Sequence, residues 1–345
     1  MLRSKKCSSF GIIMKKSGGT VNYIGSKTKL IPFLRETIKG VVGKDLSQKS
    51  LCDLFAGSGV VGRAFKDEAD FIISNDIEYY SYVLNYNALL GKTIHHACDY
   101  IETLNELKPL EGLIYQHYCE GSGCGRVYFS DLNGQKIDAL RQAIESYKED
   151  KNLYYFLLAS LLKSADKVAN TASVYSSFLK TLKPLACKEM VLEGLDFEPD
   201  EKSHQVFCED ANTLISKIKG DILYLDPPYN HRQYGANYHL LNTIAFYDVF
   251  EPQGKTGVRN YISSPYCKRG SAFSALEALI REAKFRYIFL SYNDEGLISQ
   301  SDIAQIMRRY GRYEAQSIPH QRFKAYDNKQ CKNFTREYLH ILEKF

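Results

Sequence analysis

The segment Asp226-Pro227-Pro228-Tyr229 combines residue types that suit one kind of chemistry, the binding of an exocyclic amino group on a planar heterocycle. It follows the apolar run 222–225, which predicts a buried strand ending at the Asp226 carboxylate. Proline fixes its own φ and has no backbone N–H, so the Asp226 carboxylate and the Pro227 carbonyl stand out as acceptors. These two acceptors match the two N–H groups of an amine, on whose ring Tyr229 can stack. The alternative interpretation is a plain turn at the end of a strand.

A second pattern begins at Asp53 and contains the spacing Gly-x-Gly-x-x-Gly. Gly57 and Gly59 permit a sharp turn and the close approach of a ligand where the next helix begins. The spacing alone also occurs in ordinary tight turns from a strand into a helix. Asp76 and Asp210 follow further apolar runs and suit ribose hydroxyls and an adenine amine, so together they indicate an adenosine pocket. Asp53 suits an ammonium group of a ligand better than a phosphate.

Short apolar runs that alternate with helical patterns must position these residues. The runs lie at 51–55, 71–74, 206–208, 222–225 and 287–290. They are typical of buried parallel strands, so the sequence predicts an α/β fold with a doubly wound sheet. Residues 99–201 lack this strand-like pattern and instead have apolar residues at helical spacing in 137–147 and 153–168. This predicts an inserted helical domain. Partial alternation in 313–326 and 334–342 predicts a closing hairpin.

Composition narrows the class of protein. The chain has 345 residues, 44% of them hydrophobic, which is enough for a large domain with a smaller one. No apolar stretch is long enough to span a membrane, and the first residues lack a signal-peptide pattern, so we expect a cytoplasmic protein. The nine cysteines show no repeated spacing and predict no disulfide framework. His117, Cys119 and Cys124 come nearest to a metal cluster, but their spacing does not fit the common closed sites, so no metal is expected.

Basic residues gather in two parts of a chain whose net charge is +5. Residues 1–35 contain eight Lys or Arg and no acid, and residues 308–336 contain eight basic residues against two acidic ones. Within the second group, Arg322 and Lys324 alternate with aromatic residues, a mixture that binds phosphates and stacks on bases. Basic stretches are also common on solvated surfaces, so charge alone is weak evidence for a nucleic-acid partner.

The chain as a whole resembles the D12 class of DNA N6-adenine methyltransferases. The family's N-terminal motif, Gly-rich turn and catalytic tetrapeptide are matched, in the same order, by residues 22–30, 53–59 and 226–229. Further stretches that read like members of this family are 164–170, 230–241 and 290–296. The tetrapeptide alone also occurs in RNA-adenine methylases, whereas the ordered set with a long insert before it is more specific.

The resemblance implies S-adenosyl-L-methionine as cofactor and assigns residues to it. The implied cofactor-binding residues are Tyr23, Lys27, Asp53, Phe55, Gly57, Gly59, Asp76 and Asp210, with Glu78 competing with Asp76 for the ribose. The implied catalytic residues are Asp226, Pro227, Pro228 and Tyr229. The candidate DNA contacts are Arg232, Tyr234, Asn293, Arg322 and Lys324. For each of these last five a structural role is at least as well supported, and Asn293 in particular suits the capping of a turn.

We therefore predict a Rossmann-like S-adenosylmethionine-dependent methyltransferase sheet with an inserted, mainly helical DNA-recognition domain. The expected divisions are an N-terminal arm and cofactor-binding part at 1–98, the helical insert at 99–201, and a catalytic part with a basic hairpin at 202–345. The expected activity is site-specific methylation of adenine N6, with the base flipped out of duplex DNA.

We further expect a monomer that serves as the modification enzyme of a restriction-modification system, with duplex DNA as partner and a cognate restriction endonuclease acting on the same site. Three alternatives remain open at this point. An RNA adenine-N6 methyltransferase would share the tetrapeptide and the fold. A nicotinamide-dependent oxidoreductase would explain the Gly-rich turn alone, and a non-catalytic DNA-binding module would explain only the basic segments.

Overall fold

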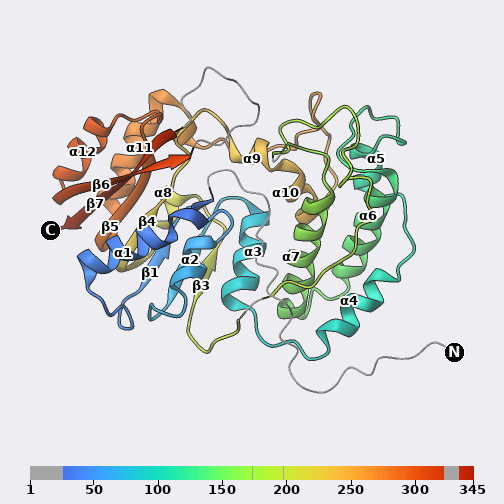
Figure 1. Cartoon of the computed structure of the whole chain (residues 1–345), viewed down its shortest axis with the longest axis horizontal. Helices are drawn as coiled ribbons and strands as arrows, with labels where there is room; N and C mark the ends of the chain where they lie inside the picture. The colour runs from blue at the N-terminus through green and yellow to red at the C-terminus, as the bar shows by residue number, and fades with distance from the viewer. Residues whose placement is uncertain (1–25, 173, 197, 322–333) are drawn as a thin grey trace.

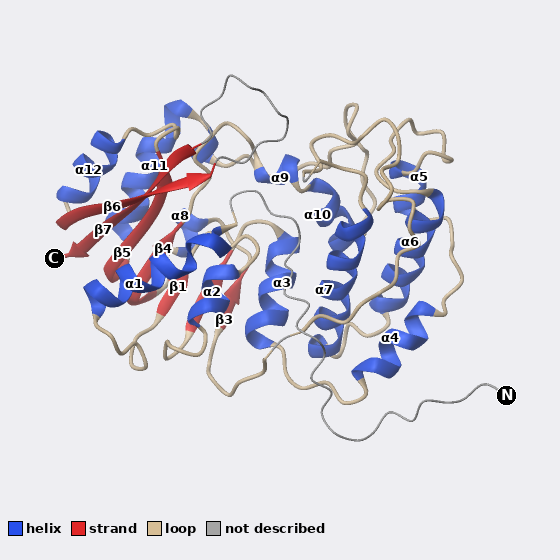
Figure 2. Ribbon diagram, in the orientation of Figure 1, coloured by secondary structure: helices blue, strands red, loops and turns tan. Residues whose placement is uncertain are grey.

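The computed structural model describes residues 26–172, 174–196, 198–321 and 334–345 and arranges them in two lobes (Figure 1). One lobe is a β-sheet with helices on both faces, and the other consists of helices (Figure 2). Helix α3 (Tyr79–Leu90) lies between the sheet and the remaining helices of the second lobe. Within the described ranges, no helix has the length and apolar character needed to cross a membrane.

The sheet has seven strands in the order β3-β2-β1-β4-β5-β7-β6. Their bounds are β1 (Leu51–Asp53), β2 (Ile72–Asn75), β3 (Gln205–Phe207), β4 (Lys219–Leu225), β5 (Lys284–Asn293), β6 (Gly311–Gln321) and β7 (Phe334–Lys344). The first five pair in parallel, whereas β7 runs antiparallel between β5 and β6. All five predicted parallel strands and the predicted closing hairpin are confirmed. The residues between the two hairpin strands lie outside the described ranges.

The order of the strands fixes where a ligand can bind. The chain moves outward from β1 to β3 and then returns to the other side of β1 with β4, so the topological switch point lies between β1 and β4. Open α/β sheets bind ligands at this point, in the crevice outside the carboxyl ends of the strands. Asp53 is the last residue of β1, Asp76 directly follows β2, and Asp226 directly follows β4. Three acids therefore meet at one edge of the sheet.

Alternate residues of each central strand face two separate hydrophobic cores, because successive side chains on a strand point to opposite faces. On β4, Ile222 and Tyr224 belong to one core and Leu223 and Leu225 to the other. The first core is covered by η1 (Lys27–Leu30), α1 (Ile31–Val42) and α2 (Val60–Phe65). The second is covered by α8 (Ala211–Leu214), η2 (Pro265–Cys267), α11 (Arg269–Glu282) and α12 (Gln300–Arg308). Burial on both faces explains why the strands read as continuous apolar runs.

The helical lobe has its own core and includes the helices predicted from their spacing. It contains α4 (Ala97–Asn105), α5 (Leu113–Tyr118), α6 (Asp131–Glu145) and α7 (Lys151–Val168). Side-chain caps begin the two long helices: Ser130 accepts from the N–H of Asn133, and Asp150 accepts from that of Leu153. The core of this lobe also takes in residues of α3 and of α9 (Tyr234–Asn237) and α10 (His239–Phe246). The helical packing thus reaches past residues 99–201, whose exact bounds as a domain remain a prediction.

A buried arginine joins the predicted insert to the segment that follows the predicted catalytic tetrapeptide. Arg141 of α6 donates to the backbone carbonyls of Ile244 and Ala245, at distances of 3.1 Å. These carbonyls belong to the last turn of α10, which lacks partners within its own helix. A cation at a helix C-terminus also complements the helix dipole. Helix α10 is therefore held by the insert as well as by the sheet lobe.

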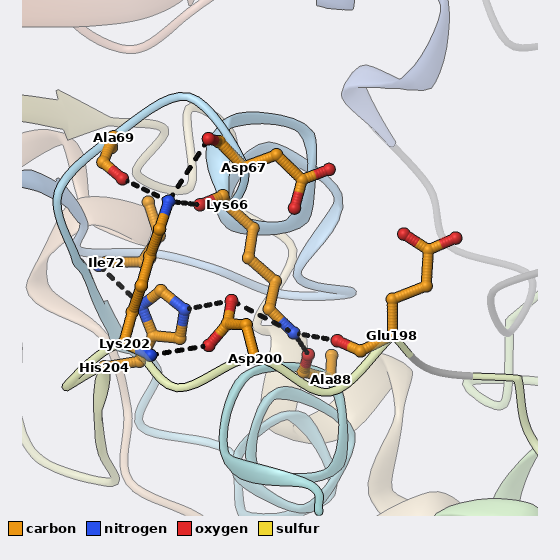
Figure 3. A network of polar contacts seen from close by, with 9 residues as sticks. All are labelled: Lys66, Asp67, Ala69, Ile72, Ala88, Glu198, Asp200, Lys202 and His204. Atoms are coloured by element: carbon orange, nitrogen blue, oxygen red, sulfur yellow. Dashed lines mark hydrogen bonds and ion pairs between the residues drawn. The ribbon is translucent and has the colours of Figure 1, made fainter. Parts of the chain in front are cut away.

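A polar network ties the return of the chain from the insert to the edge of the sheet (Figure 3). Lys202 donates to the carbonyls of Lys66, Asp67 and Ala69, and Nδ1 of His204 accepts from the N–H of Ile72 at 2.9 Å. Because Nδ1 is an acceptor, the ring proton is on Nε2, which lies 3.0 Å from the carboxylate of Asp200. The network places β3 beside β2 and so brings the start of α8 to the cleft described next.

Candidate active site

A cleft of about 950 Å³, including its open mouth, lies at the carboxyl edge of the sheet. The lining includes these residues predicted from sequence: Lys27, Asp53, Phe55, Asp76, Asp210, Asp226, Pro228 and Tyr234. They come from segments far apart in the chain, and the switch point of the sheet brings them into one cavity. Five of the predicted cofactor residues and the predicted catalytic acid therefore line the same cleft.

Gly57 and Gly59 of the Gly-rich turn shape the cleft without lining it. Gly57 and Gly59 have φ of 51° and 73°, the left-handed region that favours glycine. A Cβ at Gly59 would also collide with the side-chain oxygen of Asn85. The two glycines turn the chain so that the intervening Ser58 lines the cleft. The N–H of Gly57 donates to Asp76 Oδ2 at 2.7 Å, which ties the turn to the end of β2.

The two candidate ribose ligands differ in their surroundings. Asp76 accepts backbone hydrogen bonds at both oxygens, from Gly57 and, at 2.9 Å, from Glu78. The Glu78 carboxylate accepts from the side chain of Asn242 on α10. Burial raises the pKa of Glu78 to about 7, and the neighbouring Asp76 adds to the rise. Both acids line the cleft. Asp76 braces the Gly-rich turn, whereas Glu78 is engaged with the helical lobe.

The cleft is strongly acidic. Among the residues that the structure describes, its lining contains six acidic residues, Asp53, Asp76, Glu78, Glu209, Asp210 and Asp226, and one basic residue, Lys27. Burial, together with the nearby Asp226, raises the pKa of the Asp53 carboxyl to about 8. Oδ1 of Asp53 is buried and has no hydrogen-bond donor among the described residues. A cationic ligand suits such a cavity, whereas a pyrophosphate would be repelled.

Asp226 shares a buried ammonium with a second acid. Lys27 Nζ lies 2.8 Å from Asp226 Oδ1 and 3.3 Å from Glu337 Oε1. Burial raises the pKa of Asp226 to about 6; Lys27 opposes this shift and Glu337 adds to it. Burial alone lowers the pKa of Lys27, but the two carboxylates outweigh burial and raise it well above its ordinary value. Glu337 was not predicted, because nothing in its local sequence shows that β7 returns beside the end of β5.

The remaining residues of the tetrapeptide differ in exposure. Pro227 is buried, Pro228 lines the cleft, and Tyr229 is half-buried beside it. The Tyr229 ring packs edge-on against Tyr292, with centroids 6.1 Å apart, and its carbonyl accepts from Leu297 at 2.9 Å. Within the described part of the chain, the Pro227 carbonyl accepts no hydrogen bond. An acceptor therefore remains available next to Asp226.

Asp210 and Phe55, two further predicted cofactor residues, also line the cleft. Asp210 caps α8 by accepting from the N–H of Thr213 at 2.9 Å. Phe55 packs edge-on against Tyr266, with centroids 5.2 Å apart and an angle of 82° between the rings. Tyr266 was not predicted, although it lines the cleft and donates to Asn212 at 2.7 Å. Its neighbours carry no motif that marks it in the sequence. Tyr23 lies outside the described residues.

The candidate DNA contacts differ in where they lie in the structure. Tyr234 lines the cleft and stacks on Tyr238, with centroids 5.9 Å apart. Arg232 is exposed and lies outside the lining. Asn293 is 8% exposed, and its side chain accepts from the N–H of Glu295, so it caps the turn after β5. Arg322 and Lys324 lie outside the described residues.

The segment between α10 and η2 reaches the mouth of the cleft. Gln233 donates to the Ser263 hydroxyl at 3.1 Å and accepts from the N–H of Ser264 at 2.9 Å. Ile262 lines the cleft next to these residues and is 69% exposed. On the other side, Arg126 of the insert donates to the carbonyl of Gly254 at 3.2 Å. The segment is thus fixed at both ends, and it presents an apolar side chain at the opening.

Two of the candidate metal ligands, Cys119 and Cys124, contact backbone carbonyls instead. The Cys119 thiol lies 3.8 Å from the Ile114 carbonyl and the Cys124 thiol 3.4 Å from the Cys119 carbonyl. Among the described residues, no group of three or more His, Cys, Asp or Glu is placed to hold a metal ion.

A mainly parallel sheet that ends in an antiparallel hairpin, with an acidic cleft at its switch point, defines a Rossmann-like methyltransferase. The sequence comparisons narrow this class. Residues 23–306 match the family model of D12 class N6 adenine-specific DNA methyltransferases, and the chain belongs to this family. The nicotinamide-dependent and RNA-directed alternatives are not favoured by this result.

Curated relatives extend the match over nearly the whole chain. The type II methyltransferase M.NlaIII of Neisseria lactamica is 56% identical over 332 residues, which cover 94% of this chain and 99% of that protein. M.CviAII of Paramecium bursaria Chlorella virus 1 is 37% identical, over 88% of this chain and 93% of its own length. M.FokI of Planomicrobium okeanokoites is 34% identical over 94% of this chain, which corresponds to 53% of that longer protein.

Proposed function

We propose that this protein is a site-specific DNA methyltransferase that transfers a methyl group from S-adenosyl-L-methionine to N6 of an adenine flipped out of duplex DNA. One observation carries the proposal: the Asp226 carboxylate lines the same acidic cleft as the Gly-rich turn, in a chain that belongs to the D12 class. Its similarity to proteins named type II methyltransferases supports a role as the modification enzyme of a restriction-modification system. A restriction endonuclease acting on the same site would then be its functional partner.

The residues of the cleft fit the proposed methyl donor, which would supply an electrophilic methyl group on a sulfonium centre. The donor carries its positive charges at the sulfonium and the α-ammonium, and the six carboxylates of the lining favour such a ligand. Asp53, with its unpartnered buried oxygen, is the proposed acceptor for the ammonium. Asp76 is the proposed ribose ligand and Asp210 the acceptor near the adenine. Phe55 and Tyr266 offer aromatic surface in the same cleft.

The proposed catalytic role of Asp226 and Pro227 follows from the electronic structure of adenine. The N6 lone pair is delocalised into the ring, so the amino group is a weak nucleophile. Two hydrogen bonds, to Asp226 Oδ2 and to the Pro227 carbonyl, would draw the nitrogen toward tetrahedral geometry and orient its lone pair. Lys27 occupies Oδ1, whereas Oδ2 and the Pro227 carbonyl have no hydrogen bond among the described residues. The direct displacement needs no covalent intermediate on the enzyme.

Capture of the target base requires aromatic surface near these acceptors. Extrusion of an adenine from duplex DNA costs a few kcal/mol and is offset by stacking in the pocket and by contacts to the duplex. Tyr234, which lines the cleft, and Tyr229 beside it are the proposed stacking partners. The basic segments at 1–35 and 308–336 are the proposed phosphate contacts. DNA binding should therefore weaken steeply as salt concentration rises.

Incorporation of labelled methyl groups tests the function. The purified protein is incubated with S-adenosylmethionine labelled in the methyl group and, separately, with duplex DNA or structured RNA. The expected result is incorporation into DNA only, with N6-methyladenine as the labelled nucleoside and one sequence context for every modified base. Labelling of RNA alone, or of a cytosine, would refute the proposal.

A further inference from the structure

We propose that Glu337 is a positioning residue for methyl transfer: its buried carboxylate shares the Lys27 ammonium with Asp226, so that Lys27 fixes Asp226 without cancelling its charge. This inference rests on the proposed function and deepens it. Glu337 lies beyond the region matched by the family model, which ends at residue 306.

The strand pairing explains how Glu337 reaches the site. On β7 it lies directly opposite Asn293, the last residue of β5, at the carboxyl edge of the parallel strands. Asp226 follows the end of the adjacent strand β4 at the same edge. Because β7 runs antiparallel to the other strands, it places Glu337 at the edge of the sheet where the parallel strands end.

The environment of Glu337 is costly for a carboxylate unless a cation compensates it. The residue is 5% exposed, and removing a charged group from water costs several kcal/mol. Its counter-charge is Lys27 Nζ at 3.3 Å, and Glu337 makes no other ion pair within the described ranges. Lys27 is 4% exposed and lies closer to Asp226, at 2.8 Å. The three groups form one buried cluster of two acids and one base.

The number of charges in the cluster determines how strongly Asp226 can accept a hydrogen bond. If Lys27 paired with Asp226 alone, the pair would be neutral and the carboxylate a weaker acceptor. Glu337 restores one net negative charge, while the ammonium still holds Oδ1 in place. The two neighbours act on the pKa of Asp226 in opposite directions: Lys27 lowers it and Glu337 raises it.

Other titratable groups near Asp226 also influence its pKa, and they do so whether or not Glu337 is present. Asp53 at the end of β1 interacts with Asp226 electrostatically, as do Tyr224 on β4, Tyr229 in the tetrapeptide and Tyr234 on α9. A change confined to Glu337 leaves all four in place. The effect of removing its charge can therefore be assigned to Glu337.

The test compares the pH dependence of kcat/KM for duplex DNA, at saturating methyl donor, among the wild type and three variants. Glu337→Gln removes the charge and keeps the size, Lys27→Met removes the ammonium, and Glu343→Gln makes the same chemical change on β7 away from the cleft. Glu343 pairs with Arg286 and Arg312. The acid limb of such a profile reports the pKa of an essential base in the donor-bound enzyme before DNA binds.

The two cleft variants should shift the acid limb in opposite directions. Loss of Glu337 lowers the pKa of Asp226, so the limb moves to lower pH, by about half a unit. Loss of Lys27 moves it to higher pH, by about one unit. At pH values above both limbs, Glu337→Gln should be slower than the wild type by about threefold, the rate equivalent of half a unit of acceptor strength. Glu343→Gln should match the wild type throughout.

A second measurement does not depend on catalysis. Unfolding of the donor-free protein by urea is compared for the wild type, Lys27→Met, Glu337→Gln and the double variant, since residues that interact directly give non-additive effects. Additive effects, or an unmoved acid limb in Glu337→Gln, would overturn the inference. If Glu337→Gln does not fold, Glu337→Asp, which keeps the charge, replaces it in the test. An acid limb of Glu337→Asp at lower pH than that of the wild type would also contradict the inference. A wild type that transfers no methyl group to DNA contradicts the proposed function, whereas an active wild type with an unmoved limb contradicts only the role of Glu337.

Discussion

Binding of the methyl donor should release a proton from Asp53. Burial raises the pKa of this carboxyl to about 8, and Oδ1 has no hydrogen-bond partner. At pH 7 the donor-free carboxyl is then about nine-tenths protonated, since one pH unit corresponds to a tenfold ratio. A cationic ligand beside it favours the ionised form. Donor binding should therefore expel about 0.9 proton from Asp53 at this pH.

The same protonation gives donor affinity a defined dependence on pH. Ionising Asp53 at pH 7 costs about 1.4 kcal/mol, and this cost rises by the same amount for each pH unit below that. The affinity of the wild type should therefore increase about tenfold from pH 6 to pH 7 and level off above pH 8. Asp53→Asn cannot ionise, so its affinity should be weaker at high pH and should lack this slope.

Isothermal titration calorimetry in two buffers of different ionisation enthalpy measures the released protons directly. The comparison of wild type with Asp53→Asn isolates the proton released by Asp53, because the α-ammonium of the free donor is already mostly protonated at pH 7. The difference in proton release should be about 0.9 at pH 7. Equal proton release by the two proteins, or parallel pH slopes, would show that Asp53 is already ionised or does not face the donor.

Further predictions concern stability and the mouth of the cleft. In the donor-free protein, the raised pKa of Asp53 contributes stability that is present below about pH 4 and lost as pH rises through about 8. Across this window, the free energy of unfolding of the wild type in urea, relative to that of Asp53→Asn, should fall by up to about 1.4 kcal/mol per pH unit. Gly59→Ala should lower the free energy of unfolding by about 1–3 kcal/mol because of its positive φ, whereas Gly40→Ala, in open space on α1, should be neutral or stabilising; equal effects would contradict this. Lys202→Ala should cost about 1–3 kcal/mol through lost hydrogen bonds to three carbonyls, and a fully stable variant would show that the network in Figure 3 does not hold the edge strand. Ile262→Asp should slow methylation of duplex DNA and leave donor binding unchanged, whereas an equal loss in Val249→Asp, a fully exposed residue, would argue against a specific role at the mouth.

Local sequence patterns predicted the part of the fold that depends on burial. The runs around Leu51, Ile72 and Ile222 are buried on both faces of a parallel sheet, so they are apolar throughout and easy to recognise. The Gly-rich turn is also visible, because Gly59 takes a backbone conformation that other residues rarely adopt. Asp53 and Asp226 could be placed near each other because each one ends or follows a parallel strand.

Features that depend on long-range pairing could not be predicted. Glu337 enters the site through the pairing of β7 with β5, and Tyr266 through packing against Phe55, and neither has a local motif. The core of the helical lobe recruits Tyr80 from α3 and Leu241 from α10, although both lie outside the predicted insert. Such contacts are set by how the elements pack, which spacing along the chain does not encode.

The central claim is that Asp226 orients the amino group of the target base in the cleft that holds the methyl donor. Single-turnover methyl transfer from pre-bound donor to duplex DNA, compared between the wild type and Asp226→Asn, tests it most directly. We predict that the variant binds the donor within about twofold of the wild type and loses at least about a hundredfold in the rate of transfer, the scale of loss for a group that acts in the transition state. Transfer by Asp226→Asn at a rate close to that of the wild type would contradict the account.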